Sequence, residues 1–307
     1  MKTFSKLVTL LIMLTPLATA QQPQTRVFRE GGNWAQEITG SLTAARNLKV
    51  KVDVGSVRVQ GGSQQAIDYV IHTRAYTSSE DRARREFDAF KISAYVRGDT
   101  AFVVAEWEGN SPRKFSGDFV LNVPRNIDSV KVETDGGAVT GTGIVGRMDA
   151  TSGGGSIHFD DIGGATSAET GGGSIRLASA KGPVRAETGG GSIELNGVPS
   201  ARAETGGGSI VAKFVPSTGE HTDSILETSA GDITVYVVSN LNITIRASIE
   251  MANGHKIHSD FPEIRITTEG DEGEPKTITG EGNLNGGGPV LKVRTTTGDI
   301  WLRRASR

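Results

Sequence analysis

A glycine corner that recurs at nearly constant spacing is the feature that most limits what this chain can fold into. The octapeptide AETGGGSI occurs at 168–175, 186–193 and 203–210, and ATSGGGSI precedes these copies at 150–157. An apolar residue closes each corner every 17 or 18 residues, at Val139, Ile157, Ile175, Ile193 and Ile210. Fixed periods of about this length are typical of stacked repeats, in which each unit buries its apolar side against its neighbours.

Each period contains two short strands. Val184–Thr188 alternates small or apolar residues with charged ones, three glycines follow, and Ser192–Leu195 alternates again. The second corner, at 196–200, contains the Asn, Gly and Pro that turns favour. The pattern predicts an all-β fold, a single-chain β-solenoid (β-helix) with coils of about 18 residues. Degenerate copies of the corner extend this pattern at 50–57, 226–233, 252–257 and 293–300.

A segment of different character lies between the first copy and the second. We expect strands over Ile67–Ala75 and Ile92–Glu106, and a helix that follows the capping residues of Thr77–Asp81. These elements would form a small α+β head over the first coil. The predicted organisation is a signal peptide at 1–20, an N-terminal extension at 21–47, the first coil with the α+β insertion at 48–128, and solenoid repeats at 129–307.

The first twenty residues predict export. Lys2 and Lys6 precede the apolar run Leu7–Leu17, and Ala18-Thr19-Ala20 is a small-residue cleavage site. The run is too short to cross a membrane, and no later stretch is long enough, so we expect no transmembrane segment. The chain has no cysteine, and its 33 basic and 35 acidic side chains nearly balance, which argues against a nucleic-acid partner. We expect a periplasmic or extracellular protein.

The glycine corners do not predict a cofactor site. Phosphate-binding glycine loops lead into a helix, whereas each corner here leads into a strand, and the same objection removes Gly141–Gly146 as a dinucleotide motif. Calcium-binding β-rolls need an aspartate in the turn, and Arg176 stands at that position. We therefore expect neither a cofactor nor a metal ion.

Three other local motifs have plain structural explanations. Arg97-Gly98-Asp99 matches a tripeptide that integrins recognise, but Gly followed by Asp also suits a hairpin turn. His255 and His258 would face opposite sides of a strand and would not converge on a metal. The acidic run 269–274 lacks the spacing of a calcium loop. We expect a turn, surface histidines and a solvated loop.

Several of these features together resemble a family of bacterial "putative adhesin" proteins built from Gly-rich β-strand repeats. They are the export signal, the opening LKVKVDVGSVRVQGG, the helical insertion, the return FVLNVPRNIDSVKVETDGG and the corners ETGGGSI and TTTGDI. The resemblance extends over nearly the whole chain after residue 20. It implies a secreted or envelope-associated solenoid and supplies no catalytic residues.

The outward-facing side chains are the best functional candidates. One step beyond each buried apolar residue, alternation points outward, which predicts a ligand face of His158, Arg176, Glu194, Thr234, His258 and Trp301, with Val211 in the same column. A second column, Glu133, Glu169, Glu187 and Glu204, would be repulsive unless Arg185, Arg202 or a cation offsets it. We expect a non-enzymatic binding or scaffold protein whose partner is an envelope glycan or a surface protein.

Two alternatives stay open. A polysaccharide-active β-helix enzyme would need clustered acids and aromatic sugar platforms, but aromatic residues make up only 6% of the chain, and Asp160 and Asp161 should point apart. The second alternative is an assembly element whose rods stack end to end. Arg303, Arg304 and Arg307 argue against it, because they predict a charged end that prevents strand pairing.

Overall fold

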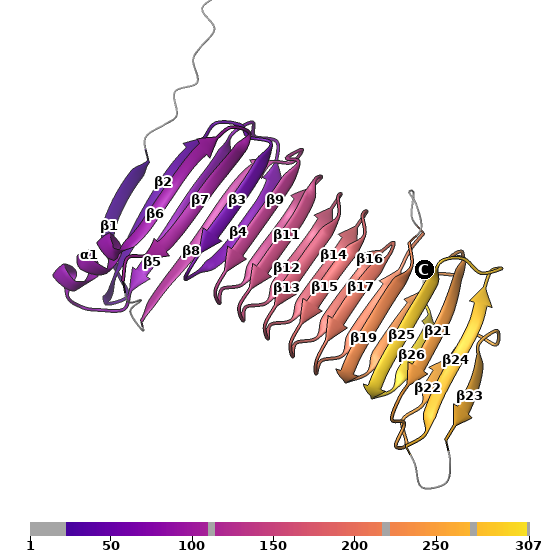
Figure 1. The fold of residues 1–307 in the computed structure, drawn as a ribbon. Coiled ribbons are helices and arrows are strands. Elements are labelled where there is room, and N and C mark those ends of the chain that lie inside the picture. The colour runs from indigo at the N-terminus through magenta and orange to yellow at the C-terminus, as the bar shows by residue number, and fades with distance from the viewer. Residues whose placement is uncertain (1–22, 110–113, 217–221, 271–274, 306–307) are drawn as a thin grey trace, which may run out of the picture.

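Two large mixed β-sheets make up almost the whole protein. The computed structural model describes residues 23–109, 114–216, 222–270 and 275–305, and the signal peptide expected at 1–20 lies outside these residues. Each sheet has 13 strands, and together they form an elongated, twisted two-layer body (Figure 1). The expected all-β class is confirmed. Within the described chain, no helix is long and apolar enough to cross a membrane.

The central repeats place one strand in each sheet in turn. The first sheet receives parallel strands β10 (Val139–Ile144), β12 (Ile157–Ile162), β14 (Ile175–Ala180), β16 (Ile193–Val198), β18 (Ile210–Phe214) and β20 (Ile233–Val237). The second sheet receives β9 (Ser129–Thr134), β11 (Arg147–Ser152), β13 (Thr166–Thr170), β15 (Val184–Thr188), β17 (Ala201–Thr205) and β19 (Ser224–Ala230). The chain thus crosses between the sheets at every corner.

The core between the sheets is built from columns of identical or similar residues. Ile157, Ile175, Ile193 and Ile210 pair in register along the first sheet, and each is at most 1% exposed, so the predicted isoleucine column is confirmed. The inner face of the second sheet carries a buried alanine column at Ala150, Ala168, Ala186 and Ala203. Large side chains on one sheet and small ones on the other let the two sheets pack closely.

A column of buried hydroxyl groups, here called the hydroxyl ladder, fastens each glycine corner to the preceding one. The Thr188 Oγ1 donates to the carbonyl oxygen of Gly173 at 2.8 Å and accepts from the N–H of Gly191 at 3.2 Å. The other members, which donate to the equivalent glycine carbonyls, are Thr134, Ser152, Thr170, Thr205, Thr228 and Thr295. Polar backbone groups at the buried corners are satisfied in this way.

The predicted insertion contributes strands to both sheets. Helix α1 (Glu80–Ala89) begins after Ser79, whose side chain accepts from the N–H of Arg82, and it buries Ala83 and Phe87. Strands β5 (Ile67–Ala75) and β8 (Phe115–Pro124) join the first sheet, and β6 (Phe90–Arg97) and β7 (Thr100–Trp107) join the second. Arg97-Gly98-Asp99 forms the β6–β7 hairpin turn, with Gly98 at φ +60°, as expected. The N-terminal extension forms the antiparallel pair β1 (Gln24–Glu30) and β2 (Asn33–Leu42) at the end of the first sheet.

At both ends of the body the strands do not stack in sequence order. Near the N-terminus, β3 (Asn47–Val52) and β4 (Ser56–Gly62) lie between the later pair β7 and β8 and the pair β9 and β10. Near the C-terminus, β25 (Val290–Thr297) and β26 (Ile300–Arg304) lie between β19 and β20 on one side and β21 (Ile243–Ile249) and β22 (Ile257–Ser259) on the other (Figure 1). The second sheet then ends with antiparallel β24 (Thr277–Leu284) and β23 (Arg265–Glu269).

The position of β26 between β20 and β22 corrects one sequence-based expectation. Arg303 and Arg304 do not form a charged end of the body, because β26 is an interior strand that pairs with both β20 and β22. Arg307 lies outside the described residues. The edge strands at this end are β22 and β23 instead.

Substitution of Ile193 by Ala should lower the free energy of unfolding by about 2–5 kcal/mol, because the change leaves a cavity in the isoleucine column. Denaturant unfolding followed by circular dichroism measures the effect. Glu194→Ala is the matched control, since the neighbouring side chain is exposed and should alter stability little. A loss below about 1 kcal/mol for Ile193→Ala would contradict close packing of the column.

Neighbouring glycines of one corner should respond oppositely to the same substitution. A Cβ at Gly191 would lie 2.1 Å from the carbonyl oxygen of Gly173, whereas a Cβ at Gly190 would meet nothing within 4 Å. Gly191→Ala should therefore cost about 1–3 kcal/mol or more through overpacking, while Gly190→Ala should be nearly neutral. Melting temperatures of the two variants test this, and equal values would show that the corners are not in close contact.

Candidate functional site

A groove runs across six neighbouring strands on the outer face of the second sheet. It has a volume of about 540 Å³ and crosses β13, β15, β17, β19, β25 and β21. One wall is a row of carboxylates in register, here called the glutamate row, formed by Glu169, Glu187, Glu204 and Glu227. Gly189 and Gly206, which line the groove just beyond this row, have no side chains to fill it. The corner sequence Glu-Thr-Gly therefore generates both the wall and the hollow.

The glutamate row differs slightly from the predicted column. Glu133 belongs to the same row, but Thr151 separates it from Glu169. Glu227 on β19 extends the row in the other direction, where Arg294 follows it. The uninterrupted part thus spans four strands.

Basic side chains offset the repulsion within the glutamate row. Arg185 and Arg202 form ion pairs with Glu187 and Glu204 on the same strands, the first at 2.6 Å, as the sequence suggested. Arg294 Nη2 lies 2.7 Å from Glu227 Oε1 and its Nη1 lies 3.6 Å from Glu250 Oε1. Ser167 stands where β15 and β17 carry arginine, so Glu169 has no such partner on its own strand.

The same pairing continues beyond the groove. Lys131 Nζ lies 2.6 Å from Glu133 Oε1, and this hydrogen bond raises the pKa of the lysine. On the next strand, burial raises the pKa of the Asp149 carboxyl, partly opposed by the charges of Arg147 and Lys131. Lys131, Arg185 and Arg202 therefore lie beside the acidic row on the outer face, but Asp149 and Ser167 separate Lys131 from the two arginines.

The structure brings the predicted ligand face of the first sheet into one row. In spatial order, the row is His158, Arg176, Glu194, Val211, Thr234, Trp301 and His258. Trp301 precedes His258 because β26 is inserted between β20 and β22. The sequence could not show this order, because Trp301 comes later in the chain.

Several side chains of this row contact each other, so the groups involved are not free to bind a ligand. Arg176 Nε lies 2.8 Å from Glu194 Oε2. The rings of His258 and Trp301 stack with centroids 3.8 Å apart and planes 10° apart, and the Arg303 guanidinium lies 4.6 Å from the Trp301 ring. One face of the tryptophan is therefore covered and cannot stack on a sugar ring.

The other sequence candidates do not converge. Asp161 has φ +54° and forms an ion pair with Arg125, while its neighbour Asp160 is exposed. His255 Nδ1 lies 3.3 Å from Asp299 Oδ1, whereas His258 stacks on Trp301. The part of the acidic loop at 271–274 lies outside the described residues. Among the residues that are described, no group of three or more His, Cys, Asp or Glu side chains could hold a metal ion.

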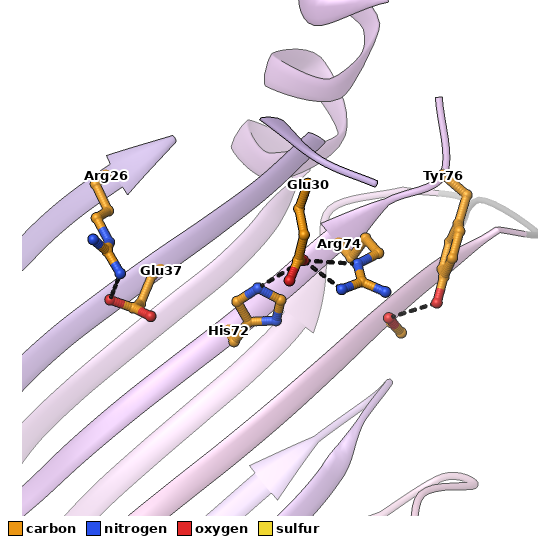
Figure 2. A network of polar contacts seen from close by, with 7 residues as sticks. Arg26, Glu30, Glu37, His72, Arg74 and Tyr76 are labelled. Carbon is orange, nitrogen blue, oxygen red and sulfur yellow. Dashed lines mark hydrogen bonds and ion pairs between the residues drawn. The ribbon is translucent and has the colours of Figure 1, made fainter. Parts of the chain in front are cut away.

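A charged network at the end of the first sheet was not predicted (Figure 2). Glu30 on β1 accepts from Arg74 on β5, with 3.1 Å from Arg74 Nε, and lies 3.3 Å from His72 Nε2. Arg26 and Glu37 form a second ion pair at 2.8 Å. The contacts cross β2 and tie the edge strand β1 to β5, so the network is structural. The sequence does not reveal the network, because Glu30 and its partners His72 and Arg74 lie more than 40 residues apart in the chain.

This network should make the stability of the wild-type protein depend on pH, because protonation of Glu30 breaks its ion pairs. The hydrogen bond from Arg74, with the charges of Arg74 and His72, lowers the pKa of Glu30 below its ordinary 4.5. A lowered pKa means that the contribution is complete above pH 4.5 and is lost as the pH falls through the folded-state value. Melting temperatures of the wild type and Glu30→Gln should therefore converge in acid. A constant difference between pH 7 and pH 3 would contradict this assignment.

Comparisons with known proteins give remote structural likenesses. No protein-family model matches the sequence, and no curated protein matches it either. The chain is similar to the crystal structure of a "putative adhesin" from Bacteroides fragilis, with 11% identity, a TM-score of 0.46, and coverage of 88% of this chain and 97% of that one. It is also similar to a "putative lipid binding protein" from Parabacteroides distasonis (12% identity, TM-score 0.38, coverage 92% and 97%). A third likeness is to a "putative cell adhesion protein" from Clostridium sporogenes (12% identity, TM-score 0.31, coverage 92% and 99%).

Proposed function

We propose that the protein is an exported, non-enzymatic binding or scaffold protein of the bacterial cell envelope, located in the periplasm or outside the cell. Its central repeats act as a β-solenoid, and the outer faces of this solenoid contact an elongated envelope glycan or a surface protein. The observation that carries the proposal is the groove along the glutamate row, in which the same side chain recurs on four successive strands.

The alternating path of the chain supports the solenoid. Each repeat adds one parallel strand to each sheet, and hydrogen bonds of the hydroxyl ladder join successive corners. In such an array each repeat contacts only its neighbours, so the array can lengthen without changing its cross-section. The outcome is an extended surface with a regular period.

That period suits a partner that also repeats. Neighbouring strands lie about 4.8 Å apart, so Glu169 and Glu227, three strands apart, are separated by about 14 Å. A polymer lying in the groove could present equivalent groups to successive glutamates. Catalysis would instead require a few groups that converge on one reacting atom.

The row on the first sheet is the second face through which the partner could be held. His158, Arg176, Glu194, Thr234, His258 and Trp301 present both charges, two imidazole rings and one indole ring along one line. Because Arg176 and Glu194 pair with each other, exchanging them keeps the ion pair and reverses the pattern that a partner would meet. This property provides a matched variant for the first sheet.

The test is a binding screen of residues 21–307 against envelope fractions and a glycan panel that includes cationic amino-sugar polymers. Glu187→Gln with Glu204→Gln should weaken binding of the captured partner at least about tenfold, since two charged contacts are removed. The melting temperature should stay nearly constant, because these ion pairs are partly exposed. The exchange Arg176→Glu with Glu194→Arg is the matched variant on the opposite sheet.

Three outcomes would change the proposal. Weakening by the exchange variant alone would move the contact surface to the first sheet. The absence of saturable binding to any fraction or glycan would remove the binding function. Depolymerisation of a polysaccharide with turnover, abolished by Asp160→Ala or Asp161→Ala, would establish the alternative of a β-helix enzyme.

A further inference from the structure

The second sheet is longer than the first at the C-terminal end of the body. The first sheet ends at β22, which pairs with β26 through only three residues, Ile257–Ser259. The second sheet continues past β21 with β24 and β23. Among the described residues, no strand of the first sheet therefore lies opposite the inner face of this two-strand extension.

One half of this inner face is covered by the chain itself. Phe261 and Ile264, which follow β22, are each only 7% exposed. Glycines on β24 make room for them: a Cβ at Gly282 would lie 2.9 Å from Ile264 Cδ1, and one at Gly280 would lie 3.4 Å from Ile264 Cγ2. The segment after β22 thus closes the end of the core beside Gly280 and Gly282.

The other half remains open as an apolar pocket of about 570 Å³. Its walls include Ile257 from β22, Ile266 from β23 and Ile278 from β24. Ile257 is buried, Ile278 packs against the main core, and Ile266 is 43% exposed. The pocket therefore leads from the surface to the end of the core between the sheets. Its volume lies in the usual range of small-ligand sites, about 300–1,000 Å³.

Basic groups lie among the lining residues of this pocket. Lys256 lies directly before β22 and Lys276 directly before β24, so the two lysines approach the pocket from different strands. The carboxylate of Asp299 is engaged by His255 and by the backbone N–H of Lys256. Glu269, at the end of β23, pairs in register with Thr277 next to Lys276. An apolar pocket with two lysines suits a ligand with an aliphatic tail and an anionic head group.

We propose that this pocket binds a single-chain amphiphile, with its aliphatic tail against Ile257, Ile266 and Ile278 and its carboxylate or phosphate head group at Lys256 and Lys276. The site is separate from the outer faces that the proposed function uses, so either proposal can fail without the other. A protein strand is a poorer occupant, because β22 offers only three residues for pairing.

Chain length gives the first test, on the wild-type protein. Isothermal titration calorimetry with unbranched carboxylates of six to fourteen carbons, each below its micellar concentration, measures Kd. Affinity should rise about fourfold for each added methylene until the pocket is full and then level off. A continued rise without a plateau, or no saturable binding, would overturn the proposal.

Head-group variants test the role of the lysines. Dodecanoate and dodecyl phosphate should bind, and dodecyltrimethylammonium should bind at least about tenfold more weakly. Lys256→Ala with Lys276→Ala should remove this difference. Equal binding of the cationic probe to the wild type would overturn the assignment of the head group, and a stronger response to phosphate than to carboxylate would identify the source of the anion as a phosphate ester.

Substitution in the tail site gives the third test. Ile266→Asp should weaken dodecanoate binding at least about tenfold by placing a charge where the tail lies. Val211→Asp is the matched control, since Val211 is 37% exposed on the outer face of the first sheet, and it should leave the affinity unchanged. If Ile266→Asp lowers the melting temperature, Ile266→Asn replaces it. Unchanged affinity in a folded Ile266 variant would show that the amphiphile binds elsewhere.

Discussion

The bond between a buried hydroxyl and the glycine carbonyl of the preceding corner is the interaction on which the rest of this structure depends. Among the described residues it is made at seven corners, always by a Thr or Ser at or near the C-terminal end of a second-sheet strand. The hydroxyl fixes the corner, and the glycines let one corner approach the next to a distance that a Cβ would forbid. The close stacking that results brings the isoleucine and alanine columns into register and sets the distance between outward-facing side chains.

The corner motif therefore also determines which side chains line the outer surface. Because Glu precedes the hydroxyl residue and Gly follows it, repetition of one short motif creates a line of carboxylates beside a hollow. Arginines two positions before Glu187 and Glu204, and Arg294 beside Glu227, offset the repulsion within the line. Binding surfaces on irregular proteins need a separate solution for each side chain. In this protein the same corner motif is repeated along the body, and this regular spacing favours a partner whose own groups repeat.

Local pattern was enough to predict most of this architecture. The period of the corners gave the isoleucine column, the alternation gave both outward rows, and the capping residues before Glu80 located the helix. Strand order was the part that local pattern could not give. Residues 293–300 look like one more copy at the end of the series, yet β25 pairs between β19 and β21 and β26 between β20 and β22, because hydrogen bonding along a sheet depends on which edges are free and not on chain order. The end pocket was missed as well, since its walls come from β22 in the first sheet and from β23 and β24 in the second.

The late insertion of β25 and β26 has a consequence for how the molecule is completed. Strands β21 to β24 come earlier in the chain, yet in the described residues they join the repeats through the two sheets by way of β25 and β26. Before β25 and β26 pair, strands β21 to β24 would be linked to the repeats by the connecting chain alone. In each sheet two unpaired strand edges would then face each other across a gap one strand wide. Among the described strands, β25 and β26 pair with both sides, through β19 and β21 in one sheet and through β20 and β22 in the other. Each of the two sheets therefore becomes continuous only when residues 290–304 have paired.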